Sequence, residues 1–190
     1  SRLPCQMRNG GQLRALADRQ GIALICSTYA PEDVALVAPY VDHFKVASFE
    51  AGYGELLLAH VEPLRAKPAA WLFVSLGLDT GPGVAMAALV DGGLETDRLR
   101  LLHCVSAYPA PTEQLNLRRI TTPNGLGLLA GFSDHSDPEQ TWTGALAVAA
   151  GARVIEAHLR MDATRPGNPD YRHAMNPSQF AGYVRHIRYA

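Results

Sequence analysis

Six short apolar runs recur along the chain, and each is rich in β-branched or aromatic residues. They cover residues 22–26, 43–47, 71–76, 99–105, 128–132 and 153–157. Their apolar positions are nearly continuous rather than alternating, which is typical of strands in a parallel sheet covered on both faces. The pattern therefore predicts six parallel strands.

Segments with the apolar spacing of helices lie between these runs. They cover residues 12–20, 31–40, 55–67, 83–92, 139–150 and 177–187. The stretch after the 99–105 run is less regular, because Pro109 and Pro111 interrupt it. Strands that alternate with helices through short links predict an α/β fold, either a (β/α) barrel or a doubly wound open sheet.

Polar side chains stand at or near the carboxyl end of almost every predicted strand. They are Ser27, Thr28, Lys45, Ser48, Glu50, Ser75, Ser106, Tyr108, Ser133, Asp134, His135, Glu156 and His158. In a barrel all these ends meet at one mouth, whereas in an open sheet only those beside the switch point converge. This favours a (β/α)8 TIM barrel. Because such a barrel has eight strands, we expect residues 1–190 to form one partial barrel domain of about six strand-helix units, with the first two strands absent.

Composition narrows the class of partner. The 17 basic and 18 acidic residues give a net charge of -1, so no general basic field exists to hold nucleic acid or an anionic membrane. No run of roughly 18 apolar residues predicts a membrane span, and no basic segment followed by an apolar run predicts a signal peptide. Cys5, Cys26 and Cys104 form no C-x-x-C pair, which favours a reducing, cytoplasmic setting.

Two histidines follow neighbouring predicted strands, His135 after residues 128–132 and His158 after residues 153–157. Two imidazoles, with oxygen ligands from water and substrate, suit a divalent metal that keeps open positions, and Mn²⁺, Zn²⁺ and Fe²⁺ all accept that set. A hydrogen-bonded structural role is the alternative for a single histidine, but the pair at adjacent strand ends favours a metal site. The other histidines are assigned mainly to structure or surface: His43, His60, His103, His173 and His186.

Lys45 lies inside an apolar strand, where a lysine is costly to bury without an anionic partner. This predicts binding of a phosphate or a carboxylate. The hydroxyls of Ser48, Ser75, Ser106 and Ser133 can complete such an anion site, although serine is also common at strand ends as a helix cap. A Schiff base on Lys45 is the alternative chemistry.

Residues 165–170 form a loop by composition. Its Arg165 and Asp170 can either close over a substrate or be solvated.

Four motifs resemble, in order and spacing, those of the sialic acid synthase family. They are residues 45–50, 103–111, 131–136 and 156–158, within a likeness that covers about residues 12–187. The family includes N-acetylneuraminate, legionaminate and pseudaminate synthases and relatives in spore coat polysaccharide synthesis. The resemblance implies condensation of phosphoenolpyruvate with an N-acetylmannosamine-like sugar, with release of phosphate and formation of a nine-carbon 2-keto acid.

The resemblance also implies roles for single residues. His135 and His158 match the ligands of a divalent metal, expected to be Mn²⁺, with Mg²⁺, Co²⁺ or Zn²⁺ as alternatives. The positions that hold phosphoenolpyruvate match Thr28, Lys45, Ser48, Ser75 and Ser133. Ser106 and Tyr108 match a substrate-contacting strand end, Glu50 an acidic residue near the reacting carbons, and Asp170 a residue that contacts the sugar.

The family's C-terminal antifreeze-like domain, which contributes an arginine across a homodimer, is not expected in this chain. Ala157, Leu76 and Ser106 depart from the family pattern, which bears on the choice of sugar. Two alternatives remain: another phosphoenolpyruvate-dependent barrel synthase, and a non-catalytic ligand-binding relative in polysaccharide biosynthesis.

Overall fold

The computed structural model describes residues 9–77, 83–121 and 129–190. The chain forms two compact units. Unit 1 comprises Ser1–Val74 and Thr80–Arg100, and unit 2 comprises Ser75–Asp79 and Leu101–Ala190. Cys5 and Leu128, which entered the sequence interpretation, lie outside the described residues.

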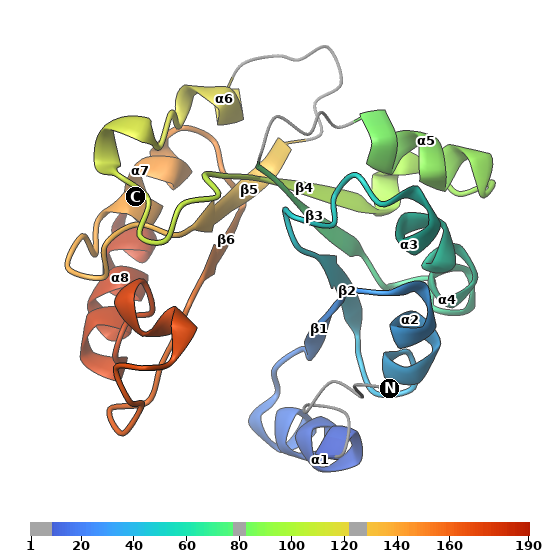
Figure 1. Cartoon of the computed structure of the whole chain (residues 1–190), viewed down its shortest axis with the longest axis horizontal. Coiled ribbons are helices and arrows are strands. Elements are labelled where there is room, and N and C mark those ends of the chain that lie inside the picture. Colours follow the sequence, from blue (N-terminus) through green and yellow to red (C-terminus); the bar gives the residue numbers. More distant parts are fainter. Residues whose placement is uncertain (1–8, 78–82, 122–128) are drawn as a thin grey trace. The chain divides into compact units, whose positions relative to one another are not determined.

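The six strands follow one another in chain order, with no reversal (Figure 1). They are β1 (Ile25–Thr28), β2 (His43–Val46), β3 (Leu72–Leu76), β4 (Leu99–Cys104), β5 (Leu129–Asp134) and β6 (Val154–Ala157). The β1–β2, β2–β3, β4–β5 and β5–β6 pairs are all parallel. A doubly wound sheet needs a switch point at which the strand order reverses, and a (β/α) barrel does not. The prediction of an α/β fold with six parallel strands in barrel order is confirmed.

Unit 1 packs its helices beside β1 to β3. Its elements are α1 (Gly10–Gln20), α2 (Pro31–Val37), α3 (Gly54–Ala59), α4 (Val61–Ala66), α5 (Gly83–Asp91) and the 3₁₀ turn η2 (Thr96–Arg98). In Figure 1, α2, α3 and α4 lie along the same side of these strands. Apolar residues from both layers are fully buried, among them Phe44, Val46, Leu56, Leu64 and Leu72. This buried layer fixes the position of β2, the strand that carries Lys45.

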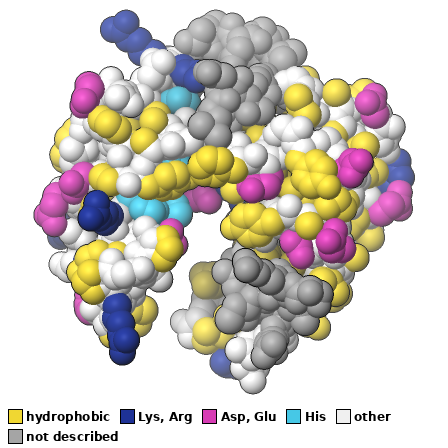
Figure 2. All heavy atoms as spheres, in the orientation of Figure 1, with side chains coloured by type: hydrophobic (Ala, Val, Ile, Leu, Met, Phe, Trp, Pro, Cys, Tyr) yellow, Lys and Arg dark blue, Asp and Glu magenta, His cyan; other side chains and the backbone are white. Residues whose placement is uncertain are grey.

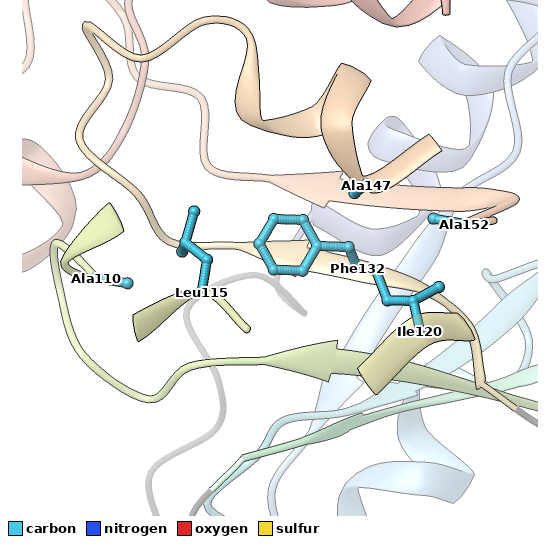
Figure 3. Close-up of a cluster of buried hydrophobic side chains, with 6 residues drawn as sticks. All are labelled: Ala110, Leu115, Ile120, Phe132, Ala147 and Ala152. Atoms are coloured by element: carbon cyan, nitrogen blue, oxygen red, sulfur yellow. The ribbon is translucent and has the colours of Figure 1, made fainter. Parts of the chain in front are cut away.

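Unit 2 contains the 3₁₀ turn η3 (Thr112–Gln114), α6 (Arg118–Thr121), α7 (Thr143–Ala149), the 3₁₀ turn η4 (Pro169–Arg172) and α8 (Pro177–Tyr189). Figure 3 shows part of its apolar core, in which Phe132 of β5 lies between Leu115, Ile120 and Ala147. Phe132 has no exposed surface. Because Phe132 anchors β5 in this core, the residues after it are held at a fixed point of unit 2. Among the described residues, no helix has the length and hydropathy that a membrane span requires.

Two corrections to the predicted elements have a clear local cause. The first strand begins at Ile25 rather than at Ile22, because Ile22 belongs to the cap that follows α1. Gly21 adopts a left-handed φ of 64°, and the Gly21 and Ile22 amides donate to the carbonyls of Asp18 and Ala17. This is the Schellman motif that closes many helices, and glycine is the residue that takes its φ without strain.

The second correction concerns residues 55–67, which form two helices rather than one. α3 ends before His60 and α4 begins after it. Pro63 has no amide hydrogen and its ring collides with a preceding turn, so it is tolerated only in the first turn of a helix. The helix therefore restarts just upstream of Pro63.

Candidate functional site

His135 and His158 lie side by side in unit 2. In the parallel register of β5 and β6, Asp134 is opposite Ala157, so the next residue on each strand is a histidine. Their ring centroids are 5.3 Å apart and the planes are inclined at 63°. The structure thus brings together the two histidines that the sequence proposes as a metal pair.

One hydrogen bond fixes the orientation of the His135 ring. Its Nδ1 lies 2.8 Å from the carbonyl oxygen of Val105, which accepts, so Nδ1 carries the proton. Nε2 then presents a lone pair, and the hydroxyl of Ser133 lies 3.3 Å from it. Burial lowers the pKa of His135 below its ordinary value, so the ring is neutral at pH 7. A neutral imidazole whose second nitrogen is tied to a carbonyl is the usual form of a metal-ligating histidine.

A third histidine joins this pair, and the sequence interpretation missed it by assigning it to structure or surface. The ring centroid of His173 is 4.4 Å from that of His158 and 4.8 Å from that of Tyr108. His173 follows η4, one helical turn after Asp170, and its Nε2 is 3.6 Å from Asp170 Oδ1. One ligand atom from each of His158, Asp170 and His173 lies within 4.8 Å of the others. The D-x-x-H spacing was the available signal, since residues three apart share one face of a helical turn.

His173 is 4% exposed, and among the described residues neither of its ring nitrogens has a hydrogen-bond partner. Its pKa falls to about 4, first because of burial and then because of the neighbouring His158. The ring is therefore neutral, with an unused lone pair. Figure 2 shows histidine side chains, in cyan, at the surface of the molecule. Orphaned imidazole nitrogens beside a carboxylate are a donor set that fits a divalent metal.

Asp134 points away from this cluster and joins three elements. Its carboxylate accepts hydrogen bonds from the amide and hydroxyl of Ser136, from the Thr143 hydroxyl at 2.5 Å and from the Tyr183 hydroxyl at 2.7 Å. Thr143 begins α7 and Tyr183 lies in α8. The buried position beside this carboxylate raises the pKa of Tyr183. Asp134 thus ties the end of β5 to two helices, and the backbone of the adjacent His135 is fixed with it.

The remaining predicted site residues of unit 2 lie at other strand ends. Ser75 in β3 donates to Glu156 Oε2 at 3.4 Å. Ser106 follows β4 and is half-buried. The ring of Tyr108 packs against that of His135 with centroids 4.4 Å apart. Tyr108 therefore belongs to the histidine cluster.

Unit 1 holds the other predicted group, around Lys45. Lys45 is buried in β2 between β1 and β3, with its Nζ donating to the Val46 carbonyl at 3.3 Å. The Thr28 hydroxyl lies 3.3 Å from the Lys45 carbonyl and 3.0 Å from Nε2 of His60. His60 Nδ1 in turn lies 2.8 Å from the Leu56 carbonyl, so Nδ1 carries the proton and Nε2 is the acceptor. The buried His60 therefore positions the Thr28 hydroxyl beside β2.

Ser48 and Glu50 follow Lys45 in the same unit. Ser48 is buried and Glu50 is half-buried. Among the described residues Oε2 of Glu50 is buried without a hydrogen-bond partner. Burial raises the pKa of Glu50, and the positive charge of Lys45 opposes this only in part. Glu50 therefore holds a proton more readily than a solvated carboxyl does.

A parallel (β/α) fold with imidazoles at adjacent strand ends defines the class: barrel proteins that place their ligand sites at the carboxyl ends of the strands. Among solved structures, this chain is similar to a spore coat polysaccharide biosynthesis protein from Bacillus subtilis, with a TM-score of 0.80 and 25% sequence identity. The match covers 94% of this chain and 49% of the Bacillus subtilis chain. Residues 2–190 match the NeuB family, and the chain belongs to that family. The predicted family resemblance is confirmed.

Two curated relatives describe the likeness further. An uncharacterized protein of Methanocaldococcus jannaschii is 31% identical over 93% of this chain and 51% of its own length. The N,N'-diacetyllegionaminic acid synthase of Legionella pneumophila is 41% identical over 51% of this chain and 27% of its own length. The chain spans about half the length, or less, of the curated relatives that it matches.

Proposed function

We propose that the protein to which this chain belongs condenses phosphoenolpyruvate with an N-acetylated amino sugar such as N-acetylmannosamine. The products are a nine-carbon 2-keto sugar acid and inorganic phosphate. The observation that carries the proposal is the histidine pair at the ends of β5 and β6, in a NeuB-family chain that also buries a lysine in β2. In the balanced reaction, the enol carbon of phosphoenolpyruvate bonds to the sugar aldehyde carbon, and one water molecule is consumed as phosphate leaves.

His135 and His158 are the proposed metal ligands, with Mn²⁺ expected and Mg²⁺, Co²⁺ or Zn²⁺ as alternatives. The bound ion would act as a Lewis acid on the aldehyde oxygen of the sugar. The protein's own contribution is to orient the ligands. The Val105 carbonyl holds the His135 ring so that Nε2 presents its lone pair, and Asp134 fixes the strand end that carries the ring.

Lys45 is the proposed clamp for the phosphate and carboxylate of phosphoenolpyruvate. A buried ammonium group gains most from a fully charged ligand, because water does not screen the attraction. The hydroxyls that would complete the binding of this substrate belong to Thr28, Ser48, Ser75 and Ser133. This role makes Lys45 an anion-binding residue rather than a Schiff-base nucleophile.

The remaining proposed roles concern the sugar and the proton. Ser106, Tyr108 and Asp170 would contact the sugar, and the exposed Asp170 can approach a ligand from solvent. Glu50 would exchange a proton near the reacting carbons, a role that its raised pKa favours. The proposal also includes a cytoplasmic setting, a single partial barrel domain over residues 1–190 and a homodimeric full-length protein.

The test is release of phosphate from phosphoenolpyruvate, with the 2-keto acid measured in parallel. N-acetylmannosamine and Mn²⁺ are supplied, and chelator-treated protein is the control. The proposal predicts equal amounts of both products, dependent on the sugar and on metal. Turnover only with a phosphorylated four- or five-carbon aldose would favour another phosphoenolpyruvate-dependent synthase. No turnover with metal binding intact would favour a ligand-binding relative.

A further inference from the structure

We infer that His173 is a third protein ligand of the metal, so that the ion is held by three imidazoles with the Asp170 carboxylate within reach. This inference rests on the proposed function and adds to it. The two-histidine site leaves the ion dependent on water and substrate for its other ligands. The geometry around His173 points to a site that the protein itself nearly completes.

The first argument is the spacing of the rings. Imidazoles that share one ion with bonds of about 2.1 Å and tetrahedral angles have ring centroids about 5 Å apart. The three centroid separations are 5.3 Å for His135 and His158, 4.4 Å for His158 and His173, and 6.4 Å for His135 and His173. These values lie on both sides of the expected separation. The ligand atoms of His158 and His173 already lie together with that of Asp170, and His135 and His173 must approach one another before one ion can bind all three rings.

The second argument is the absence of another use for the His173 nitrogens. Burying a polar group without a hydrogen bond costs about 1–3 kcal/mol in proteins. His173 is buried, and among the described residues neither nitrogen is hydrogen-bonded, since even Asp170 Oδ1 is 3.6 Å from Nε2. By contrast, the buried His103 of the same unit satisfies its Nε2 on the Leu115 carbonyl at 2.7 Å. Of these two buried histidines, it is His173 whose ring nitrogens still need a binding partner, and a metal ion would supply one.

The third argument is that the backbone holds His173 in place. The chain that leaves β6 after His158 returns to pair with it: Met175 donates to the His158 carbonyl and Arg160 donates to the Met175 carbonyl, both at 2.9 Å. At the start of η4, the Asn168 side chain accepts from the Asp170 amide at 2.9 Å. Asp170 and His173 are therefore presented to His158 by an ordered return segment.

The ligand set also predicts a metal preference. Imidazole suits Zn²⁺, Co²⁺ and Fe²⁺, whereas Mg²⁺ prefers oxygen ligands and keeps several waters. With three imidazoles, the protein should bind Co²⁺ or Zn²⁺ without substrate and much more tightly than Mg²⁺.

The experiment titrates the whole chain with Co²⁺ in the absence of substrates and follows the visible d–d absorption. We expect one ion per chain. H173Q should weaken Co²⁺ binding by roughly tenfold or more, because removing even an outer-sphere partner of a ligand costs about 10- to 100-fold. H186Q, which alters an exposed histidine of α8, should bind as the wild type does.

A second variant gives a positive signal. H173C keeps a metal donor at the position, so it should retain bound Co²⁺ and add a near-ultraviolet thiolate-to-cobalt charge-transfer band. That band would support the inference even if H173Q folds poorly. Absence of the band, or an unchanged Co²⁺ affinity and spectrum in H173Q, would overturn the role of His173. If H158A loses Co²⁺ binding while H173Q keeps it, the two-histidine proposal stands. If H158A also binds normally, the proposed metal site itself fails.

Discussion

Gly131 lies directly against the backbone of β6, and replacing it with alanine should force β5 and β6 apart. Gly131 pairs with Val154. A Cβ atom at this position would lie 2.0 Å from the Val154 carbonyl oxygen and 2.8 Å from its carbonyl carbon. Both clashing atoms are backbone, so no side-chain rotation can relieve the contact. His135 and His158 come directly after these two strands.

The magnitude follows from the displacement. Real Cβ contacts essentially never fall below 3.0 Å, so the two strands must separate by roughly 1 Å. Overpacking of this kind costs about 1–3 kcal/mol, and each ladder hydrogen bond that weakens adds about 1 kcal/mol. We expect G131A to lower the free energy of unfolding by about 3 kcal/mol. In urea that corresponds to a midpoint about 1–2 M lower.

The matched control is G167A in the same unit, where an added Cβ would meet nothing within 4 Å. Its urea midpoint should change little. The assay is urea unfolding followed by circular dichroism, with Co²⁺ affinity measured on the folded variants. Equal midpoints for G131A and G167A would refute the argument that close approach of the strands requires glycine at position 131.

Three further predictions concern single side chains. Y183F removes a buried hydrogen bond to the Asp134 carboxylate and should cost roughly 1.5–3 kcal/mol in urea unfolding; an unchanged midpoint would contradict this. The folded-state pKa of His60 is about 4, below its ordinary value of 6.5, so the unfolded chain binds the extra proton. The contribution of His60 to the free energy of unfolding is therefore complete above pH 6.5, and about 3 kcal/mol of it is lost as the pH falls toward 4. The free energy of unfolding of H60Q should depend less steeply on pH than that of the wild type. Identical slopes for the two proteins would exclude this role for His60. K45Q should weaken phosphoenolpyruvate binding at least tenfold in calorimetry, whereas K67Q, with the same change of charge, should not; equal losses would point to a general field effect.

The strands and their parallel order were readable from the sequence because buried strands consist of nearly unbroken apolar runs. Phe44 and Phe132, which lie in two of those runs, are both fully buried. The break at His60 was missed although Pro63 was visible, because a helical pattern of apolar residues continues through it. Ile22 was assigned to a strand because its part in a helix cap depends on the conformation of Gly21.

The candidate site could be predicted only where it follows the strands. His135 and His158 come directly after β5 and β6, so their adjacency follows from strand order. His173 is different, because it reaches the cluster through a return segment whose pairing with the chain after β6 is a tertiary contact. Local sequence shows the D-x-x-H spacing but not what it faces. The crowding at Gly131 is likewise set by the partner strand and not by its own neighbours.

The most direct test of the metal site is Mn²⁺ affinity, measured by electron paramagnetic resonance or calorimetry on the wild type, H135A and H158A. The wild type should bind one ion, and each variant should lose affinity by roughly 10-fold or more, with far-ultraviolet circular dichroism showing that each remains folded. Mn²⁺ affinity that is unchanged in both variants would contradict the assignment of His135 and His158 as the metal pair.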